Sequence, residues 1–559
     1  MISPRKLLVT IAFSLAVAGF ASASDIYFAQ NAQGANNGQD CADAYAYNDG
    51  SHGINKSANW VAGNTLHVCG TITVNAGQNI ISAQGSGSSG NPITIKFEQG
   101  AILQAPYFGT GSSAGIYLSG HNYITVNGGN SGKATGGTAW TGGLIQNYAN
   151  GSAGQKNCPG LSNTYTGACT YQQNPTTVIE AIGSNNLTIQ NLGPCIVAVV
   201  TNAQFSNGAP GADCIHFQGS NVTITNNQLY WDGLGIDNTY YGNDTNTVIS
   251  NNDFQENGWG LGCAGANVSN TNYQVFNNHF HNFDGWTGTG AHVNGIHCYD
   301  GSGGGIQQFY LYNNLFDGNM GTCCWTAWVY LEANGPGNNW NGSTGTLYAF
   351  NNIFFSPQVC CDSGNGLLNY GGPSSKGHMV VNNYFFGTPA QAGACIDFTG
   401  SGPGQTIENN VFQNCGQVIT GSTFQGNPAP GWDVWDYNIY ANISSGNPAW
   451  SVSSIKTNSF STWQSACGCD THSQAQLSSL LADITSEGVP SSGYIGIQQG
   501  ANLSAMAVGN MTALAYDTGA GNSHTPTQRP NGNWDIGSYE YASSSSIPQP
   551  PTGLSALVQ

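Results

Sequence analysis

The stretch Thr223-Ile224-Thr225-Asn226-Asn227 decides the fold, because its pattern recurs along the chain. In each copy, two or three apolar or β-branched residues run into a pair of asparagines, and a second apolar pair follows. Later copies end at the pairs Asn251-Asn252, Asn277-Asn278, Asn313-Asn314, Asn351-Asn352, Asn382-Asn383 and Asn409-Asn410. The first asparagines are separated by 25, 26, 36, 38, 31 and 27 residues, which fits coils of one minimum perimeter with loops inserted at a corner.

A period near 25 residues with short strands and glycine-rich turns predicts an all-β protein, a parallel β-solenoid in which each coil buries its apolar face against its neighbours. Asparagine at the corner tolerates left-handed backbone angles, and stacked asparagine amides bond along the axis. A β-sandwich array with asparagine-rich turns is the alternative. A propeller is disfavoured, because its four-stranded blades need about 40 residues each.

The composition excludes a charged helical protein and a disordered one. Only 6% of the 559 residues are charged, while 39% are hydrophobic and 11% aromatic. Lys and Arg number 9 against 27 Asp and Glu, so the formal net charge is −18. A surface of this sign repels nucleic acid and anionic lipid, and neither is expected as a partner.

The first 23 residues have the order of a secretory signal peptide: Arg5 and Lys6, then the apolar run Leu7 to Phe20, then small residues ending near Ala23. We therefore expect a secreted or cell-surface protein that is cleaved near Ala23. Cleavage leaves 7 basic and 27 acidic residues, a formal charge of −20. No later segment reaches the ~20 apolar residues of a membrane span. The oligomeric state is left open.

Three stretches carry a resemblance to a known group of proteins. They are the asparagine-pair coils, the start Asp25-Ile26-Tyr27-Phe28-Ala29, and the terminal motif from Arg529 to Tyr541. Together they resemble the secreted right-handed parallel β-helix proteins of the pectate-lyase-like type. The resemblance implies a right-handed parallel β-helix of about ten coils with N- and C-terminal caps. It says little about activity, since this architecture hosts lyases, hydrolases, adhesins and non-catalytic modules.

The expected organisation follows from the limits of the repeat. After the signal peptide (1–23), we predict an N-terminal cap with the first coils (24–100), the β-helix body (101–450), C-terminal coils with a cap (451–541) and a Ser/Pro linker with a truncated tail (542–559). A short helix is predicted at 474–487, and the strand from Trp534 to Tyr541 is expected to cover the last coil.

Sixteen cysteines in an exported chain predict disulfides. If Leu261 and Ile296 are equivalent strand positions, Cys263 and Cys298 lie about 4.8 Å apart on neighbouring coils, within disulfide reach. By similar offsets Cys323-Cys324 should meet Cys360-Cys361. Plausible local pairs are Cys41 with Cys69, Cys158 with Cys169, Cys195 with Cys214, and Cys395 with Cys415. Cys467 and Cys469 are left open.

A second column of strands precedes the asparagine pairs, aligned on Ile116, Ile179, Ile215, Ile236, Leu261, Ile296, Val329, Leu368, Ile396 and Ile419. If these residues point inward, each following residue points outward. The outward column then contains Tyr117, Glu180, His216, Asp237, Gly262, His297, Tyr330, Asn369, Asp397 and Thr420. This column concentrates titratable groups in the middle coils, where solvated surface residues are the alternative reading.

The column predicts a carbohydrate site. Asp237 is expected to support His216, with Asp237 and His297 about 9.6 Å apart across two coils and Gly262 leaving a gap for a sugar ring. Such groups suit glycoside hydrolysis or proton abstraction by a lyase, so His216, Asp237 and His297 are the predicted catalytic residues. The predicted substrate-binding residues, which supply aromatic rings and rim carboxylates, are Asp213, Trp231, Trp259, Asp300, Trp328, Tyr330 and Glu332.

Charge limits the substrate and the cofactors. Pectate-lyase-type enzymes commonly use Arg or Lys on acidic sugars, yet the mature chain has Arg529 alone as arginine, and Lys376 is the one lysine of the central coils. A neutral polysaccharide is therefore the expected partner, and an acidic one requires calcium, the one cofactor left open. His279 and His281 share a strand face, but without an evident third ligand no metal site is predicted. The alternative function is a non-catalytic surface adhesin or extracellular matrix protein.

Overall fold

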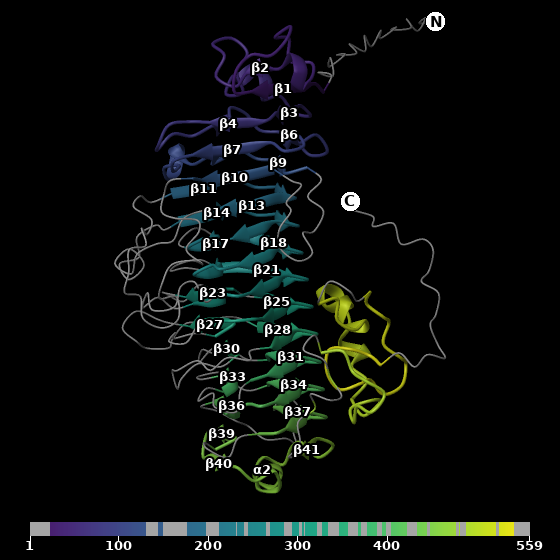
Figure 1. Cartoon of the computed structure of the whole chain (residues 1–559). Helices are drawn as coiled ribbons and strands as arrows, with labels where there is room; N and C mark the ends of the chain where they lie inside the picture. The colour runs from purple at the N-terminus through teal and green to yellow at the C-terminus, as the bar shows by residue number, and fades with distance from the viewer. Residues whose placement is uncertain are drawn as a thin grey trace, which may run out of the picture.

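A computed structural model gives the architecture of the chain. It describes residues 23–129, 143–148, 176–196, 212–230, 232–239, 244–263, 269–283, 293–300, 305–306, 308–320, 327–333, 346–355, 367–370, 377–387, 394–398, 404–421, 433–443, 448–476, 480, 484, 488–520 and 525–541. Within these ranges the chain winds as a right-handed parallel β-helix with three long sheets. Figure 1 shows the strands stacked one coil above the next.

The first sheet contains the strands that run into the asparagine corners. In spatial order they are β2 (Tyr45–Ala46), β1 (Asp25–Ala29), β3 (Thr65–Val68), β6 (Ile93–Phe97), β9 (Ile124–Asn127), β12 (Leu187–Gln190), β15 (Val222–Thr225), β18 (Thr245–Ser250), β21 (Ser269–Phe276), β25 (Gln308–Tyr312), β28 (Thr346–Phe350), β31 (Met379–Val381), β34 (Thr406–Glu408) and β37 (Val434–Asp436), with β24 (Gly305–Ile306) beside β21.

The second sheet contains the strands that leave the corners. They are β4 (Thr71–Thr73), β7 (Ile102–Ala105), β10 (Gly143–Asn147), β13 (Leu192–Ile196), β16 (Gln228–Tyr230), β19 (Asp253–Gln255), β22 (His279–His281), β26 (Leu315–Asp317), β29 (Ile353–Phe355), β32 (Tyr384–Phe386), β35 (Val411–Gln413), β38 (Ile439–Ala441) and β41 (Gln474–Gln476).

The third sheet carries the outward column predicted above. Its strands are β5 (Ile81–Ser82), β8 (Ile116–Tyr117), β11 (Thr176–Ile182), β14 (Ala212–Gln218), β17 (Leu234–Asn238), β20 (Trp259–Cys263), β23 (Asn294–Asp300), β27 (Val329–Ala333), β30 (Leu368–Tyr370), β33 (Ala394–Phe398), β36 (Gln417–Gly421), β39 (Trp450–Val452) and β40 (Ile455–Thr457). The β39–β40 pair is antiparallel. Short 3-10 turns lie at Cys41–Asp43, Ser57–Asn59, Gly111–Ser113, Ser504–Met506 and Gly509–Ala515.

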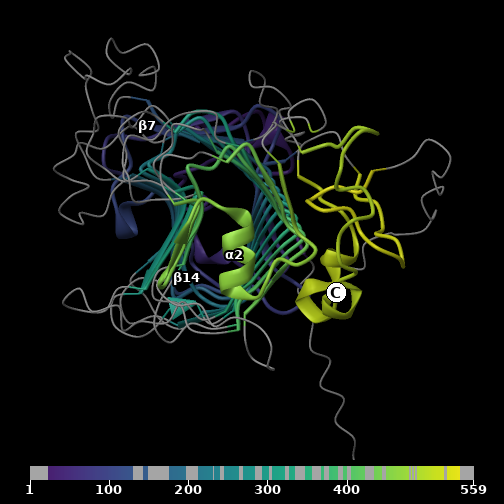
Figure 2. The same ribbon diagram turned by 90° about the horizontal axis from the view of Figure 1, so that it is seen from below.

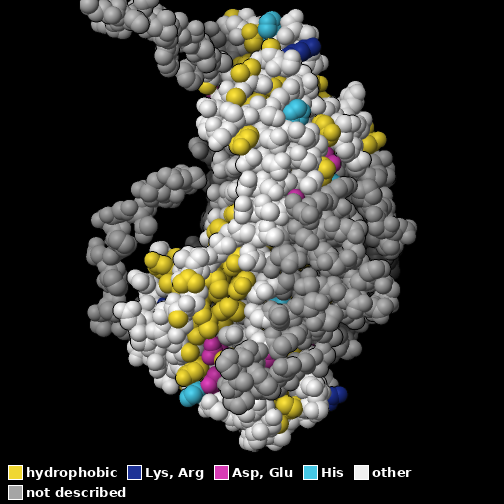
Figure 3. Space-filling view, turned by 180° about the vertical axis from the view of Figure 1, so that it is seen from behind, with side chains coloured by type: hydrophobic (Ala, Val, Ile, Leu, Met, Phe, Trp, Pro, Cys, Tyr) yellow, Lys and Arg dark blue, Asp and Glu magenta, His cyan; other side chains and the backbone are white. Residues whose placement is uncertain are grey.

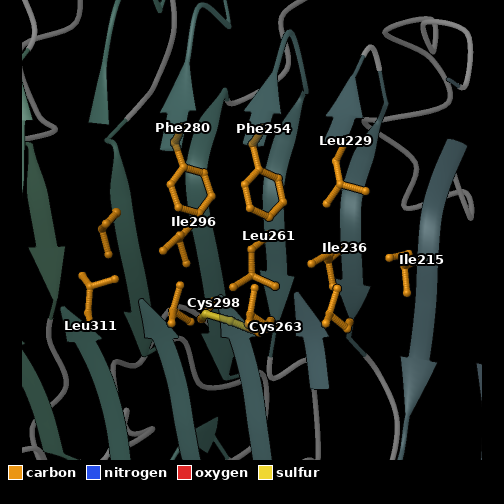
Figure 4. Packing of buried hydrophobic residues seen from close by; sticks show 14 of the residues in the cluster. Ile215, Leu229, Ile236, Phe254, Leu261, Cys263, Phe280, Ile296, Cys298 and Leu311 are labelled. Carbon is orange, nitrogen blue, oxygen red and sulfur yellow. A yellow bond between two sulfur atoms is a disulfide. The ribbon is translucent and has the colours of Figure 1, made fainter. Parts of the chain in front are cut away.

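Rows of identical side-chain types fill the coil interior. Figure 4 shows Ile215, Ile236, Leu261 and Ile296 in one row, with Phe254 and Phe280 in another. The phenylalanine row continues coil by coil through stacked rings at Phe316, Phe354, Phe385 and Phe412. Because side chains alternate along a strand, these rows direct the intervening residues to the outer face.

The asparagine pairs divide two tasks at the corner. The first member adopts a left-handed backbone, as at Asn226 with φ 57° and Asn313 with φ 55°. The second member forms a buried ladder along the axis: Nδ2 of Asn314 donates to Oδ1 of Asn352 over 3.0 Å. The same bond recurs from Asn227 through Asn438. Both predictions for these asparagines are confirmed.

The C-terminal end of the β-helix differs from the prediction. Helix α2 (Phe460–Cys467) lies across the open end of the last coil, as Figure 2 shows. The helix predicted at 474–487 is wrong in its described part, where Gln474–Gln476 forms β41 and pairs with β38. The backbone N–H of Gln474 donates to the carbonyl of Asn438 on the preceding coil over 2.8 Å, and this strand pairing outweighs the helical pattern.

The terminal motif, Arg529 to Tyr541, packs on the side of the β-helix instead of covering the end of its last coil. Trp534 joins Tyr310, Tyr312 and Phe350 in an apolar cluster outside the coils, and Phe276 packs against it. The sequence pattern predicts that Phe276, like Phe316 and Phe354, stacks in the coil interior. This is wrong for Phe276, which stacks on Tyr312 at the outer face. Arg529 is ion-paired with Glu540 and donates to Oδ1 of Asn351, which fixes this segment to the corner. Figures 1 and 2 show it beside the first sheet.

Four disulfides join described cysteines. The predicted pairs Cys41–Cys69, Cys263–Cys298 and Cys395–Cys415 are confirmed, and the pair left open, Cys467–Cys469, is also bonded. The Cα atoms of Cys263 and Cys298 are 4.4 Å apart on neighbouring coils. Cys214 is disulfide-bonded, while its predicted partner Cys195 has no described side chain. The remaining cysteines, Cys158, Cys169, Cys323, Cys324, Cys360 and Cys361, lie outside the described residues.

These disulfides indicate an oxidising, extracellular environment. In the described part of the chain, no helix has the length and apolar character needed to cross a membrane.

Candidate functional site

The predicted outward column exists in the third sheet with the register expected from the sequence. Glu180 pairs with His216, His216 with Asp237, Asp237 with Gly262, and Gly262 with His297. The column extends to Tyr117 at one end and through Tyr330, Asn369 and Asp397 to Thr420 at the other. The register is confirmed because the row of Ile215, Ile236 and Leu261 fixes the opposite face.

Three titratable residues of this column, which lie on three successive coils, meet with Asp213. Nδ1 of His216 in β14 lies 2.9 Å from Oε2 of Glu180 in β11. Its Nε2 lies 3.9 Å from Oδ2 of Asp237 in β17. Asp213, at the start of β14, has a carboxylate oxygen within 4.8 Å of the ligand atoms of His216 and Asp237. All four side chains are at most 9% exposed, so the cluster is buried although it stands on the outer face of the sheet.

Burial and mutual charge shift the protonation of this cluster. Burial raises the pKa of Asp213 well above 3.8, and the charge of Asp237 adds to the effect. Burial also raises the pKa of Asp237, against the charge of His216. For His216, burial lowers the pKa, but the hydrogen bond to Glu180 and the charges of Asp237 and Asp213 outweigh it and raise the pKa to about 9. Titratable groups whose pKa values are shifted by burial and by one another are typical of sites of acid–base chemistry.

An aromatic row continues the site toward the next coils. The ring centroids of Trp259 and His297 are 4.2 Å apart in an edge-on contact, and those of His297 and Tyr330 are 4.9 Å apart in a stack. Trp259 and Tyr330 are half-buried, whereas His297 is buried between them. Two partly exposed rings on one face can stack on sugar rings.

The gap predicted at Gly262 is filled. A Cβ at this position would lie 2.9 Å from Cδ2 of Leu234, 3.2 Å from an indole carbon of Trp259 and 3.4 Å from Cγ2 of Thr239. These side chains occupy the space between Asp237 and His297. No sugar ring enters there, and the half-buried rings of Trp259 and Tyr330 are the surfaces left for it.

Trp328 does not fit its predicted role. It is fully buried in the coil interior, where its ring lies 5.8 Å from Phe283 and 6.0 Å from Phe316 between centroids. The side chain sits just before β27, where strand alternation does not fix its direction. Trp231 lies outside the described residues, and Asp300 and Glu332 have described backbone in β23 and β27 but no described side chains.

Glu180 supplies the direct hydrogen bond to His216. The sequence predicts that Asp237 supports this imidazole, but the bond comes from Glu180 on the preceding coil. Asp237 instead accepts from the backbone N–H of Thr239 over 2.9 Å. The signal was available in the alignment, since Glu180 occupies the column position next to His216.

A second cluster stands on the outer face of the second sheet. His279 and His281 have the third neighbour that the sequence did not reveal, Asp253 on the preceding coil, and the three ligand atoms lie within 4.8 Å of one another. Nε2 of His281 is 2.7 Å from Oδ1 of Asp253, and Nε2 of His279 is 2.7 Å from Oδ1 of Asp317. Tyr230 donates its hydroxyl to Asp253.

The fold is a right-handed parallel β-helix, which solved structures of other proteins share. Similar solved structures include the surface adhesin PfbA of Streptococcus pneumoniae, with 12% identity over 76% of this chain and 93% of that chain and a TM-score of 0.33. Pectate lyase Pel9A matches with 13% identity over 94% and 98%, at a TM-score of 0.32. XylC in complex with xylose matches with 11% identity over 75% and 84%, at 0.36.

Such identities concern the fold and leave the activity undefined. No protein-family model matches the chain. No curated protein matches it either.

Proposed function

We propose that this chain is a secreted β-helix protein that binds a neutral polysaccharide and cleaves it at the outer face of the third sheet. The observation that carries the proposal is the buried array of Glu180, His216 and Asp237 on adjacent coils, next to the half-buried rings of Trp259 and Tyr330. Secretion is supported by the N-terminal sequence and by the disulfides.

The roles follow from position. Asp237 is the acid–base group nearest the aromatic row, and Glu180 orients His216 through Nδ1. Asp213 lies beside His216 and Asp237, and burial raises its pKa. Trp259 and Tyr330 hold the sugar by stacking, with His297 between them as a further proton-transfer group.

A neutral substrate is favoured by charge. The ladder positions from Tyr117 to Thr420 contain carboxylates and imidazoles but neither Lys nor Arg, so the column offers no fixed cation for a uronate. Figure 3 shows that basic and acidic side chains are sparse on the face seen from behind. Acidic glycans would additionally meet a protein of net charge −18.

The test is a panel of neutral and acidic polysaccharides incubated with the purified protein. New reducing ends without the ultraviolet absorbance of unsaturated uronate ends indicate hydrolysis of a neutral glycan, as proposed. That absorbance indicates eliminative cleavage and overturns the neutral substrate. Silence across the panel overturns the cleavage.

A non-catalytic adhesin is the second candidate, favoured by one specific surface. Asn221, Asn246 and Asn272 form an exposed amide ladder with Asn186, through Nδ2-to-Oδ1 bonds of 3.2, 2.9 and 2.8 Å. Regularly spaced amides present repeated donors and acceptors to a polymer or a cell-wall glycan. Retained glycan binding without turnover would select this function.

A further inference from the structure

We propose that Asp213, His216 and Asp237 bind one divalent transition-metal ion, with zinc as the representative of the class. Each residue offers a ligand atom, and the three atoms lie within 4.8 Å of one another. One imidazole and two carboxylates form a donor set that suits such an ion. The binding of the ion does not depend on glycan cleavage. Any part of the ion in hydrolysis rests on the proposed function, and with the ion bound Asp237 would serve as a metal ligand in place of its acid–base role.

The spacing between donors has room for an ion. Two ligands that each lie about 2.1 Å from one metal are separated by at most about 4.2 Å. Nε2 of His216 and Oδ2 of Asp237 are 3.9 Å apart, which is too far for a hydrogen bond and within this limit. An ion between them would bring both donors to bonding distance with small side-chain shifts.

A buried oxygen supplies independent support. Asp213 is 1% exposed, and among the described residues no donor bonds its Oδ1. A buried carboxylate oxygen normally finds a donor or a metal, because leaving it bare is costly. With Glu180 and Asp237, three carboxyl groups are buried around a single imidazole, and a divalent cation would stabilise the ionised form that burial disfavours.

Glu180 completes the arrangement as a positioning residue. Its Oε2 accepts from Nδ1 of His216 over 2.9 Å, so that Nε2 faces Asp237. Histidines that bind metals commonly donate their other nitrogen to a carboxylate, which fixes the ring and its tautomer. A metal at Nε2 displaces the proton there.

The second cluster differs from the first in the spacing of its donors and acceptors. There His281 and Asp253 lie 2.7 Å apart, His279 and Asp317 also 2.7 Å, and Tyr230 donates to Asp253. These donors and acceptors bond to one another directly. That cluster is a hydrogen-bonded network and serves as the matched control.

The experiment measures zinc binding by titration calorimetry and by metal analysis after dialysis, on the full protein freed of metal by chelation. Wild type should bind one zinc per chain at this site. Asp213→Asn and His216→Gln should each weaken binding at least tenfold, and Glu180→Gln should weaken it about 10- to 100-fold. His281→Gln should leave the affinity within twofold.

Three outcomes overturn the metal site: no saturable binding, equal binding in wild type and His216→Gln, or loss of binding only in His281→Gln. If Asp213→Asn fails to fold, cobalt provides the second readout, because four-coordinate cobalt in wild type should lose its strong visible absorption in Glu180→Gln. Zinc binding without glycan turnover would overturn the proposed function alone. Turnover that resists chelation, in a protein without bound zinc, would overturn the metal site alone.

Discussion

Oε2 of Glu180 lies 2.9 Å from Nδ1 of His216, across the boundary between two adjacent coils. The parallel ladder places these residues side by side, and both are buried although they point away from the coil interior. A polar pair that is buried on the outside of a solenoid is held there for a reason other than core packing. This pair is the centre of the proposed site, and it connects the fold to the chemistry.

Removing one amide from the interior asparagine ladder should destabilise the whole solenoid. Asn314 accepts from the backbone N–H and Nδ2 of Asn278, and its own Nδ2 donates to Asn352 and to the carbonyl of Val275. Asn314→Ala leaves several of these buried groups unpaired, so we expect a loss of about 3 to 5 kcal/mol in the free energy of unfolding. Denaturant unfolding measures it.

The exposed ladder offers the control for this variant. Asn221→Gly keeps the left-handed backbone of that position, φ 58°, and removes an amide that water can replace. Its expected cost is below about 1 kcal/mol. Equal losses in the two variants would contradict the structural importance of the interior ladder.

The two kinds of disulfide should differ in their effect on stability. Cys263–Cys298 closes 35 residues, whereas Cys467–Cys469 closes 2. The chain-entropy relation gives the expected loss in the free energy of unfolding. Replacing Cys263 and Cys298 by alanine should cost about 4 kcal/mol, and replacing Cys467 and Cys469 by alanine should cost about 1 kcal/mol. Thermal unfolding of the two double variants tests the difference; a larger loss from the second pair would refute it.

Glu408 should make stability depend on pH. Burial, with the charge of neighbouring Asp436, raises its pKa from 4.5 to about 7. Because the pKa of Glu408 is higher in the folded state than in the unfolded state, the contribution of this group to the free energy of unfolding is complete below pH 4.5. It is lost as the pH rises through 7. Glu408→Gln should therefore gain about 2 to 3 kcal/mol over wild type between pH 4.5 and 8. A difference that does not change with pH would contradict the raised pKa.

Adding a methyl group at Gly262 should disturb the aromatic row. The added methyl group of Gly262→Ala would meet Leu234 and Trp259, so the indole must move. We expect a loss of about 1 to 3 kcal/mol in stability and a changed tryptophan fluorescence. Unchanged fluorescence and glycan affinity would show that Trp259 takes no part in binding.

The sequence predicts the register well because two local rules agree. Strand alternation places Ile215, Ile236 and Leu261 inward. The asparagine pair at the corner marks the equivalent position in successive coils, and so fixes which residues lie side by side. Features that depend on distant packing were not predictable in this way. Phe276 lies outside because the terminal segment packs there, and Trp328 lies inside because Phe283 and Phe316 make room for it.

The candidate site shows the same division. The alignment places Glu180, His216 and Asp237 together, but it does not show which carboxylate bonds the imidazole, since this depends on side-chain rotamers. Likewise, the sequence suggests an open space beside Gly262, because glycine has no side chain. In the structure, the side chains of Leu234, Thr239 and Trp259 close this space.

The most direct test of the central claim compares glycan turnover in wild type, Asp237→Asn and Asp397→Asn. Asp397 is the matched control, because it stands in the same column with the same exposure of 8% but pairs with Asn369 and Thr420. The account predicts that Asp237→Asn lowers the release of reducing ends by at least a hundredfold while Asp397→Asn leaves it within twofold. Equal turnover in folded Asp237→Asn and wild type would contradict it.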